Sequence, residues 1–166
     1  MTTQQKTDAP ARILSINVSP GGIPKTPVDR VYVTRDGLAG DGHAHAKHSK
    51  PHRAISLIDE EVLEQLREEG YPVYPGATGE NLTVANLHVQ RLTPGTRLHM
   101  AGGVVIELSE ARKPCFVLDA IDPKLKEAIV ERCGFMARVI TEGEIESGAA
   151  ITVMENDASV DAGPSE

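Results

Sequence analysis

The sequence has few aromatic residues and lacks any long hydrophobic run. Its 166 residues include three Tyr, two Phe and no Trp, too few for the aromatic platform on which single-stranded nucleic acid stacks. Acidic residues outnumber basic ones, 24 against 17, which argues against a protein that binds duplex DNA. There is neither an apolar span of roughly 20 residues nor a signal peptide's basic and apolar segments. We predict one cytoplasmic globular protein that binds neither nucleic acid nor membrane.

Only two cysteines occur, Cys115 and Cys133. A structural disulfide is not expected in a cytoplasmic protein, so each cysteine is considered by itself. Cys133 lies on the apolar side of a predicted helix, where a cysteine usually behaves as a small buried hydrophobic residue. Cys115 follows Arg112 and Lys113 after a predicted strand, and two adjacent cations favour the reactive thiolate form. The local sequence leaves open whether Cys115 is exposed or buried.

Short runs of β-forming residues, separated by turn residues, make up most of the chain. Residues 59–69 and 122–133 instead have the apolar spacing of helices, and a glycine follows each. Ala101-Gly102-Gly103 and Glu142-Gly143 predict hairpin turns, because glycine tolerates the positive φ of such turns. The strand candidates are residues 11–18, 28–35, 54–58, 81–84, 96–100, 104–110, 135–141 and 150–154. We predict a mostly β fold, a closed or nearly closed β-barrel of short strands with about two peripheral α-helices.

Both ends of the chain differ in composition from its middle. Residues 1–10 are polar, and residues 155–166 contain four acids, no base and no apolar periodicity. Such segments cannot bury enough apolar surface to fold. We therefore predict a disordered tail over 1–10, one folded domain over 11–154 and an acidic disordered tail over 155–166.

The densest cluster of potentially functional side chains lies between Gly40 and Arg53. It holds four of the six histidines, at positions 43, 45, 48 and 52, and from Gly42 onward three basic residues and no acid. A cationic loop in which glycine lets the backbone approach closely can bind a phosphate or oxo anion. It can equally be a solvated basic loop. A zinc site is the third interpretation, although Lys47 stands where the H-x-H-x-D-H run of metallo-β-lactamase-type hydrolases has its Asp.

A second candidate is the turn Gly79-Glu80-Asn81, which leads into a predicted strand. The side chains of Glu80 and Asn81 can orient a ligand or a reactive thiol. They can instead hold the backbone amides where the strand begins.

Several segments in order resemble the MOSC family, named for the C-terminal domain of molybdenum cofactor sulfurase. They are SINVSPGGIPKTPV, GLAGDGHAHAKH, HRAISL, GATGENLTV, ARKPC and FMARVITEGEIESGAAI, and they cover about residues 13–153. The resemblance implies a mostly β, barrel-like fold. It also implies a protein that accepts sulfur as a cysteine persulfide from a pyridoxal-phosphate-dependent desulfurase, or one that binds the molybdenum cofactor with that cysteine on the metal.

The resemblance also assigns site residues by position. The family's cysteine corresponds to Cys115. Around this thiol and any pterin phosphate it implies Asp41, His43, His52, Arg53, Glu80, Asn81 and Arg138. The local cationic sequence adds His48, Arg112 and Lys113 as candidate binding residues. The pyridoxal-phosphate domain and the additional N-terminal barrel of larger members have no counterpart here, so the chain resembles a small stand-alone member.

Three functions follow as hypotheses. In the first, Cys115 carries a persulfide sulfur from a partner cysteine desulfurase, which holds the pyridoxal phosphate, to an anionic acceptor. In the second, the chain is a molybdenum-cofactor-dependent reductase of N-hydroxylated compounds with Cys115 as the molybdenum ligand. In the third, it is a non-enzymatic, His-rich metal-binding module. The first is the favoured hypothesis at the level of sequence.

Overall fold

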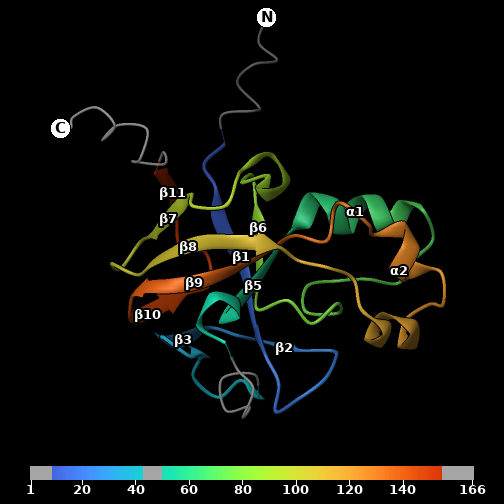
Figure 1. Cartoon of the computed structure of the whole chain (residues 1–166), viewed down its shortest axis with the longest axis horizontal. Coiled ribbons are helices and arrows are strands. Elements are labelled where there is room, and N and C mark those ends of the chain that lie inside the picture. Colours follow the sequence, from blue (N-terminus) through green and yellow to red (C-terminus); the bar gives the residue numbers. More distant parts are fainter. Residues whose placement is uncertain (1–8, 43–49, 155–166) are drawn as a thin grey trace, which may run out of the picture.

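A computed structural model describes residues 9–42 and 50–154 and shows a mostly β fold with two α-helices (Figure 1). The strands are β1 (Arg12–Val18), β2 (Thr26–Val28), β3 (Arg30–Thr34), β4 (Gly37–Leu38), β5 (Ile55–Asp59), β6 (Leu82–Ala85), β7 (Arg97–Met100), β8 (Val105–Ala111), β9 (Phe135–Thr141), β10 (Gly143–Glu146) and β11 (Ile151–Met154). The helices are α1 (Glu60–Glu68) and α2 (Leu125–Ala128), with 3-10 helices η3 (Pro51–Arg53), η4 (Val89–Arg91) and η5 (Phe116–Ala120). Both α-helices lie at the same end of the molecule. The predicted tails, 1–10 and 155–166, fall almost entirely outside the described residues.

The strands form two sheets. One has the order β11-β7-β8-β9-β5-β6-β1-β2, and the other has the order β10-β3-β4. Strands β5 and β6 are parallel and place Leu57 beside Leu82, whereas the other pairs are antiparallel. Parallel neighbours need a crossover connection, and α1 lies in the connection between β5 and β6.

The larger sheet is open at the level of strand pairing, because β11 and β2 stand at opposite ends of its order. The chain just before β11 nevertheless contacts β1. Arg12 forms an isolated bridge with Ala150, and the amide of Ile13 donates a hydrogen bond of 2.9 Å to the carbonyl of Ala149. The mostly β class with two helices is therefore confirmed, whereas the described strand pairs form open sheets rather than a closed barrel.

The two predicted hairpin turns have different outcomes. The turn at 101–103 joins β7 to its antiparallel neighbour β8, and Gly102 and Gly103 have φ of 106° and 105°. The prediction at 142–143 is wrong as a hairpin, because β9 pairs with β8 and β5 while β10 pairs with β3 in the other sheet. The glycine signal located the turn but could not identify the strands that pair beyond it.

The helix predicted over 122–133 is shorter than its apolar spacing suggested. Helix α2 ends at Ala128, and the backbone turns away from helical conformation at Glu131, whose φ is 69°. Leu125, Ile129 and Cys133 are all buried nevertheless. The spacing predicted their burial correctly and their secondary structure only in part.

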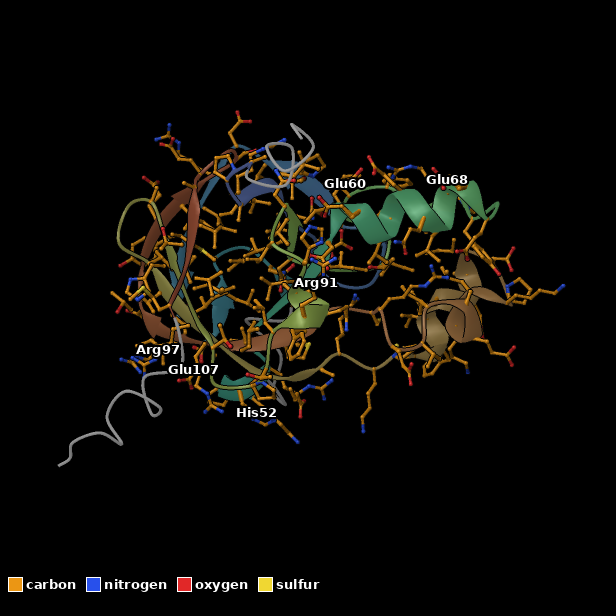
Figure 2. All side chains as sticks on the ribbon, turned by 90° about the horizontal axis from the view of Figure 1, so that it is seen from above. His52, Glu60, Glu68, Arg91, Arg97 and Glu107 are labelled. Carbon is orange, nitrogen blue, oxygen red and sulfur yellow. The ribbon has the colours of Figure 1, made fainter. Side chains whose placement is uncertain are left out.

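Buried apolar side chains form two clusters. The larger contains residues of both sheets. The smaller joins Val62, Leu63 and Leu66 of α1 to Leu125 of α2 and to Cys133, and each large aliphatic side chain fully buried there contributes about 1.5–3 kcal/mol. Figure 2 shows Glu60 and Glu68 at opposite ends of α1. Within the described ranges, neither helix has the length and apolar composition needed to cross a bilayer.

Candidate functional site

A cavity of about 330 Å³ lies between η3, the loop before β6 and the segment that follows β8. Among the described residues, basic side chains line it and no carboxylate does. The basic residues are Lys25, Lys50, Arg53, Arg112 and Lys113. A wall of one charge sign raises the local concentration of the opposite charge, so the cavity suits an anionic ligand. Its volume lies at the lower end of small-molecule sites, which occupy roughly 300–1,000 Å³.

Both cysteines line this cavity, and they differ in exposure. Cys115 is exposed and precedes η5 in extended conformation. Cys133 has 2% of its surface exposed. Burial raises the pKa of Cys133, and the positive charge of Arg112 opposes that rise only in part. Cys115 is therefore the thiol available to a metal or an electrophile, whereas Cys133 is the buried residue that its sequence context predicted.

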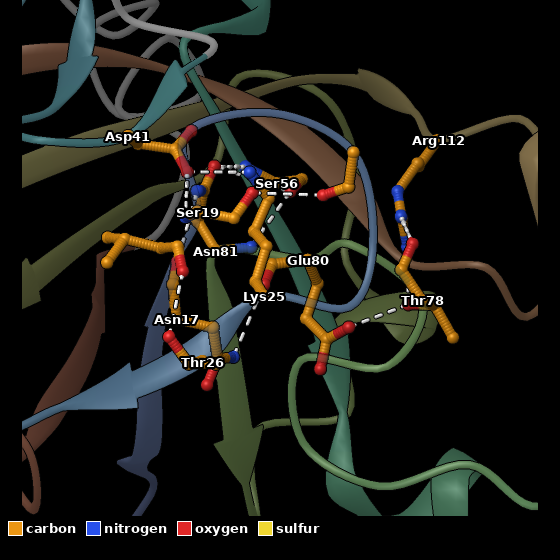
Figure 3. A network of polar contacts seen from close by, with 12 residues as sticks. Asn17, Ser19, Lys25, Thr26, Asp41, Ser56, Thr78, Glu80, Asn81 and Arg112 are labelled. Atoms are coloured by element: carbon orange, nitrogen blue, oxygen red, sulfur yellow. Dashed lines mark hydrogen bonds and ion pairs between the residues drawn. The ribbon is translucent and has the colours of Figure 1, made fainter.

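Arg112, directly after β8, is held beside the cavity by neutral oxygen atoms (Figure 3). Its Nη2 donates to the carbonyl of Thr78 at 2.6 Å, and its Nη1 donates to the Thr78 hydroxyl at 3.2 Å and to the carbonyl of Cys133 at 3.3 Å. No described carboxylate forms an ion pair with this guanidinium. Its orientation is fixed while its positive charge stays available to a ligand.

Two other basic side chains of the wall have an acidic partner. Lys25 Nζ lies 2.6 Å from Asp41 Oδ1, and this pair is nearly buried, with 11% and 1% of the side chains exposed. Arg53 Nε lies 3.2 Å from Glu110 Oε2, with both side chains about half exposed. The two remaining lysines of the wall form no ion pair with a described residue. The wall therefore keeps an excess of positive charge.

Glu80 is fully buried behind the cavity wall and does not line the cavity. Its carboxylate accepts hydrogen bonds from the hydroxyls of Thr78 and Thr83, both at 2.6 Å, and from the amide of Gly76 at 2.8 Å. Thr78 in turn accepts the hydrogen bonds of Arg112. Glu80 thus positions the wall instead of facing a ligand.

Asn81 lines the cavity together with Ser56 of β5. The amide of Ser56 donates to Asn81 Oδ1 at 3.1 Å, and the amide of Asn81 donates to Ser56 Oγ at 3.0 Å. Asn81 Nδ2 also donates to the carbonyl of Asn17 at 3.4 Å. These bonds connect β5, β1 and the residue before β6. Asn81 therefore both fixes the backbone where β6 begins and lines the cavity.

The structure brings together part of the predicted site. The predicted residues that line the cavity are Arg53, Asn81, Arg112, Lys113 and Cys115. Asp41 and Glu80 contact lining residues from behind and do not line the cavity themselves. The two carboxylates are therefore supports of the site.

Other predicted residues lie away from the cavity wall. His52 is half-buried in η3, where its carbonyl accepts the hydroxyl of Ser109. Arg138 of β9 lies with its Nε 3.4 Å from Glu107 Oε1 on β8; Figure 2 labels His52 and Glu107. The predicted residues His43 and His48 lie outside the described residues. Within the described part of the chain, no group of His, Cys, Asp or Glu side chains could hold a metal ion by itself.

Sequence reasoning missed several residues of the wall. Lys25 comes from the loop before β2, and Thr78 and Met136 come from the loop before β6 and from β9. Lys25 follows the Gly-Gly-Ile-Pro segment, and a cation at the end of a glycine-containing loop is a signal that could have drawn attention to it. Thr78 and Met136 have no such signal, because only tertiary contacts bring them to the cavity.

Comparisons with known proteins identify related sequences and structures. The profile of the MOSC domain matches residues 44–152. A protein of Gibberella moniliformis named "Reductase" is 32% identical over 133 residues, which cover 75% of this chain and 24% of that protein. This chain therefore spans about a quarter of the length of the curated relative that it matches.

Solved structures are similar as well. YiiM from Geobacillus stearothermophilus is 31% identical, with a TM-score of 0.74 over 88% of this chain and 76% of that chain. The YuaD protein from Bacillus subtilis is 18% identical, with a TM-score of 0.73 over 87% of this chain and 96% of that chain. The second likeness concerns the fold alone.

Proposed function

Because this chain belongs to the MOSC domain family, we propose that it binds a molybdenum cofactor and reduces N-hydroxylated compounds, with Cys115 as the molybdenum ligand. One observation carries the proposal: the exposed thiol of Cys115 stands at a cavity whose wall has five basic side chains and no described carboxylate. The relative named "Reductase" supports the reductase class over sulfur transfer.

The residues present fit such a group. A thiolate is a soft ligand, which suits a thiophilic metal, and Cys115 is the exposed one of the two thiols. Arginine and lysine form charge-assisted hydrogen bonds with phosphate, and Arg112 and Lys113 stand two or three positions from that thiol. When bound, the cofactor would supply transfer of electrons in pairs at its metal.

The chain's own residues have distinct tasks in this proposal. Cys115 would hold the metal, and Arg112 and Lys113 would neutralise the phosphate. Thr78 keeps the Arg112 guanidinium in place through two hydrogen bonds, and Asn81 and Ser56 add polar groups to the cavity wall. Orientation by fixed charges, rather than proton transfer by a described side chain, is the main contribution of this site.

The overall reaction requires an electron source. Reduction of R–NH–OH to R–NH₂ breaks the N–O bond and consumes two electrons and two protons, and it releases one water. The electrons must come from a separate redox protein or domain. That donor belongs to the proposal as a partner.

Metal and cofactor content test this proposal. The full chain, produced in a host that makes the cofactor, is expected to contain about one molybdenum and one pterin per chain, and Cys115→Ser should lose reductase activity and most of the metal. Cys133→Ala is the control and should keep both, because that thiol is buried. Wild-type protein without molybdenum and pterin from that host would contradict the proposal.

A sulfur carrier remains the second candidate, and the exposure of Cys115 favours it, since a partner desulfurase can reach this thiol. After incubation with a cysteine desulfurase and cysteine, a carrier gains one sulfur, about 32 Da, on Cys115. Cys115→Ala should abolish the gain. Modification of Cys133 alone, or of neither cysteine, would contradict this candidate.

A further inference from the structure

The peptide group between Cys133 and Gly134 connects two separate parts of the molecule. Its carbonyl oxygen, on Cys133, accepts a hydrogen bond of 3.3 Å from Nη1 of Arg112. Its N–H, on Gly134, donates a hydrogen bond of 2.6 Å to Oε1 of Gln90. A trans peptide is planar, and its N–H and C=O point in opposite directions. A side chain that holds the N–H therefore also fixes the direction of the carbonyl that meets Arg112.

Arg112 is hydrogen-bonded to this segment twice. Besides the bond from its guanidinium to Cys133, its backbone amide donates a hydrogen bond of 2.9 Å to the carbonyl of Gly134. Two consecutive carbonyls thus orient both the backbone and the side chain of Arg112. Thr78 accepts two further bonds from the guanidinium. The direction of the guanidinium at the cavity wall therefore depends on residues 133–134 as well as on Thr78.

Gln90 reaches this peptide from η4, 44 residues away in the chain, and does not line the cavity. Its neighbour Val89 is fully buried in the larger apolar cluster, and the amide of Val89 donates to Asp59 Oδ1 at 3.0 Å. Cys133 belongs to the smaller cluster. The Gln90 hydrogen bond thus joins the two clusters and holds the peptide against an element that is anchored independently of the cavity.

The local packing leaves the Gly134 N–H dependent on Gln90. A Cβ at residue 134 would lie 1.8 Å from the carbonyl oxygen of Leu57, so the backbone of Gly134 lies directly against β5. Its φ is 91°, a conformation that glycine adopts readily. Gly134 is buried, and a buried N–H needs an acceptor. Without the Gln90 oxygen, the peptide would have to turn to satisfy this donor, and its carbonyl would turn with it.

We propose that Gln90 is a positioning residue for Arg112, which sets the direction of the guanidinium through the Cys133–Gly134 peptide and touches no ligand itself. A hydrogen bond to the N–H of a peptide also polarises its carbonyl, which strengthens that carbonyl as the acceptor for Arg112. The inference rests on the proposed function in one respect, because Arg112 is there the residue that meets the anionic group.

Variants of Gln90 separate the loss of the acceptor from other changes. Gln90→Met removes the acceptor and keeps a side chain of similar length, and Gln90→Asn is a milder change that withdraws the acceptor by one methylene. Gln90→Glu keeps an acceptor oxygen. Gln65→Met is the matched control, because Oε1 of Gln65 also accepts a hydrogen bond from an arginine, at 3.2 Å from Nη1 of Arg132, but on the exposed surface.

The first measurement is the mobility of the Arg112 side chain, followed by NMR of its Nε–H group in the metal-free full chain. Gln90→Met and Gln90→Asn are expected to increase this mobility, whereas Gln90→Glu and Gln65→Met should leave it as in wild type. A merely structural role of Gln90 would lower the free energy of unfolding without changing this signal. Unchanged mobility of Arg112 in both Gln90→Met and Gln90→Asn would overturn the proposal.

The second measurement is the affinity of the same protein for inorganic pyrophosphate, by calorimetry. Gln90→Met should raise the Kd about fivefold, which corresponds to the loss of one hydrogen bond. The effect should persist in Lys113→Ala, where Arg112 is still present, and should fall below about twofold in Arg112→Ala. An equal increase in both backgrounds would show that Gln90 does not act through Arg112, which contradicts the proposal.

The same variants distinguish this inference from the proposed function. If the wild-type protein contains molybdenum and reduces N-hydroxylated compounds but Gln90→Met leaves the mobility of Arg112 unchanged, the positioning role is wrong while the function stands. If the wild-type protein contains no molybdenum but Gln90→Met still increases the mobility of Arg112, the positioning role stands while the function is wrong.

Discussion

Two walls of the cavity beside Cys115 differ in how their polar groups are used. Residues 76–83 form a supporting wall, in which Glu80, Asn81 and Thr83 are buried. Glu80 accepts hydrogen bonds from Gly76 and Thr83, and Asn81 is bonded to Ser56 of β5. Residues 112–117 form an exposed edge, which carries Cys115 and the cations beside it. A site of this kind separates positioning from reactivity, since a rigid buried base holds an exposed reactive edge.

The difference also shows which charges are available. The carboxylates of Asp41 and Glu80 are occupied by Lys25 and by hydroxyl and amide donors. Arg112 bonds only to neutral oxygen atoms among the described residues. An acidic residue in a family motif therefore need not contact the ligand. A guanidinium that is oriented by neutral acceptors, in contrast, keeps its positive charge available to an anionic ligand.

Chemical labelling should give the largest contrast between the two walls. In the folded protein, iodoacetamide is expected to alkylate Cys115 at least about 100 times faster than Cys133, because Cys133 reacts only after the structure opens. Peptide mass spectrometry over time measures both rates. In urea the two rates should become similar, and comparable rates in the folded state would show that the contrast in exposure is wrong.

Glu80→Gln tests the supporting wall. The amide group of Gln would face donors that now meet a carboxylate oxygen, so the free energy of unfolding should fall by about 2–3 kcal/mol. Urea denaturation measures this change. The exposed Glu64→Gln is the matched control and should stay within about 0.5 kcal/mol. An equally small change in Glu80→Gln would show that the Glu80 carboxylate does not support the wall.

Replacing each cysteine by serine gives a smaller difference in stability. Cys133→Ser buries a hydroxyl among apolar side chains and should lower the free energy of unfolding by about 1–2 kcal/mol. Cys115→Ser is exposed and should change it by less than about 0.5 kcal/mol. Equal losses measured by urea denaturation would argue against the buried and exposed assignments.

Asp59→Asn tests whether a buried carboxylate always stabilises the fold. Of the variants considered, it should change the free energy of unfolding least. Burial raises the pKa of Asp59, Glu61 adds to the rise, and the amide of Val89 and the charge of His88 oppose it. Above the folded-state pKa the buried charge lowers stability, and below the unfolded-state pKa this loss is absent.

Asp59→Asn keeps an oxygen acceptor for Val89 and removes the buried charge. The variant should therefore be more stable than wild type at neutral pH, and the advantage should shrink as the pH falls through the folded-state pKa of Asp59. Urea denaturation of both proteins at a series of pH values tests the sign. A variant less stable than wild type at neutral pH would show that the charge itself is needed.

The strands and their alternation could be predicted from local sequence, because burial on one face leaves a regular apolar pattern. Each predicted strand region overlaps a strand of the structure, whereas the short strands β2, β4 and β10 were not predicted. The pairing could not be predicted: β5 lies between β9 and β6, which come from distant parts of the chain. Turn residues specify where the chain bends, but the partner of a strand depends on which apolar faces fit together.

The residues of the site also fall into a group that the sequence predicts and a group that only the fold brings together. The cations around Cys115 were visible in the sequence, because they lie beside it in the chain. By contrast, Thr78, Lys25 and Ser56 reach the cavity from separate loops and strands. Arg138 was assigned to the site by family position, but β9 directs it toward Glu107 of β8.

By itself, the sequence determined the residue types of this protein: two cysteines in different contexts, segregated charge and few aromatic residues. The tertiary structure alone decided which thiol is exposed, which carboxylates are supports and which side chains meet at the cavity. The physical reason is that burial, hydrogen bonding and ion pairing depend on neighbours in space. Those neighbours come from positions that no local pattern connects.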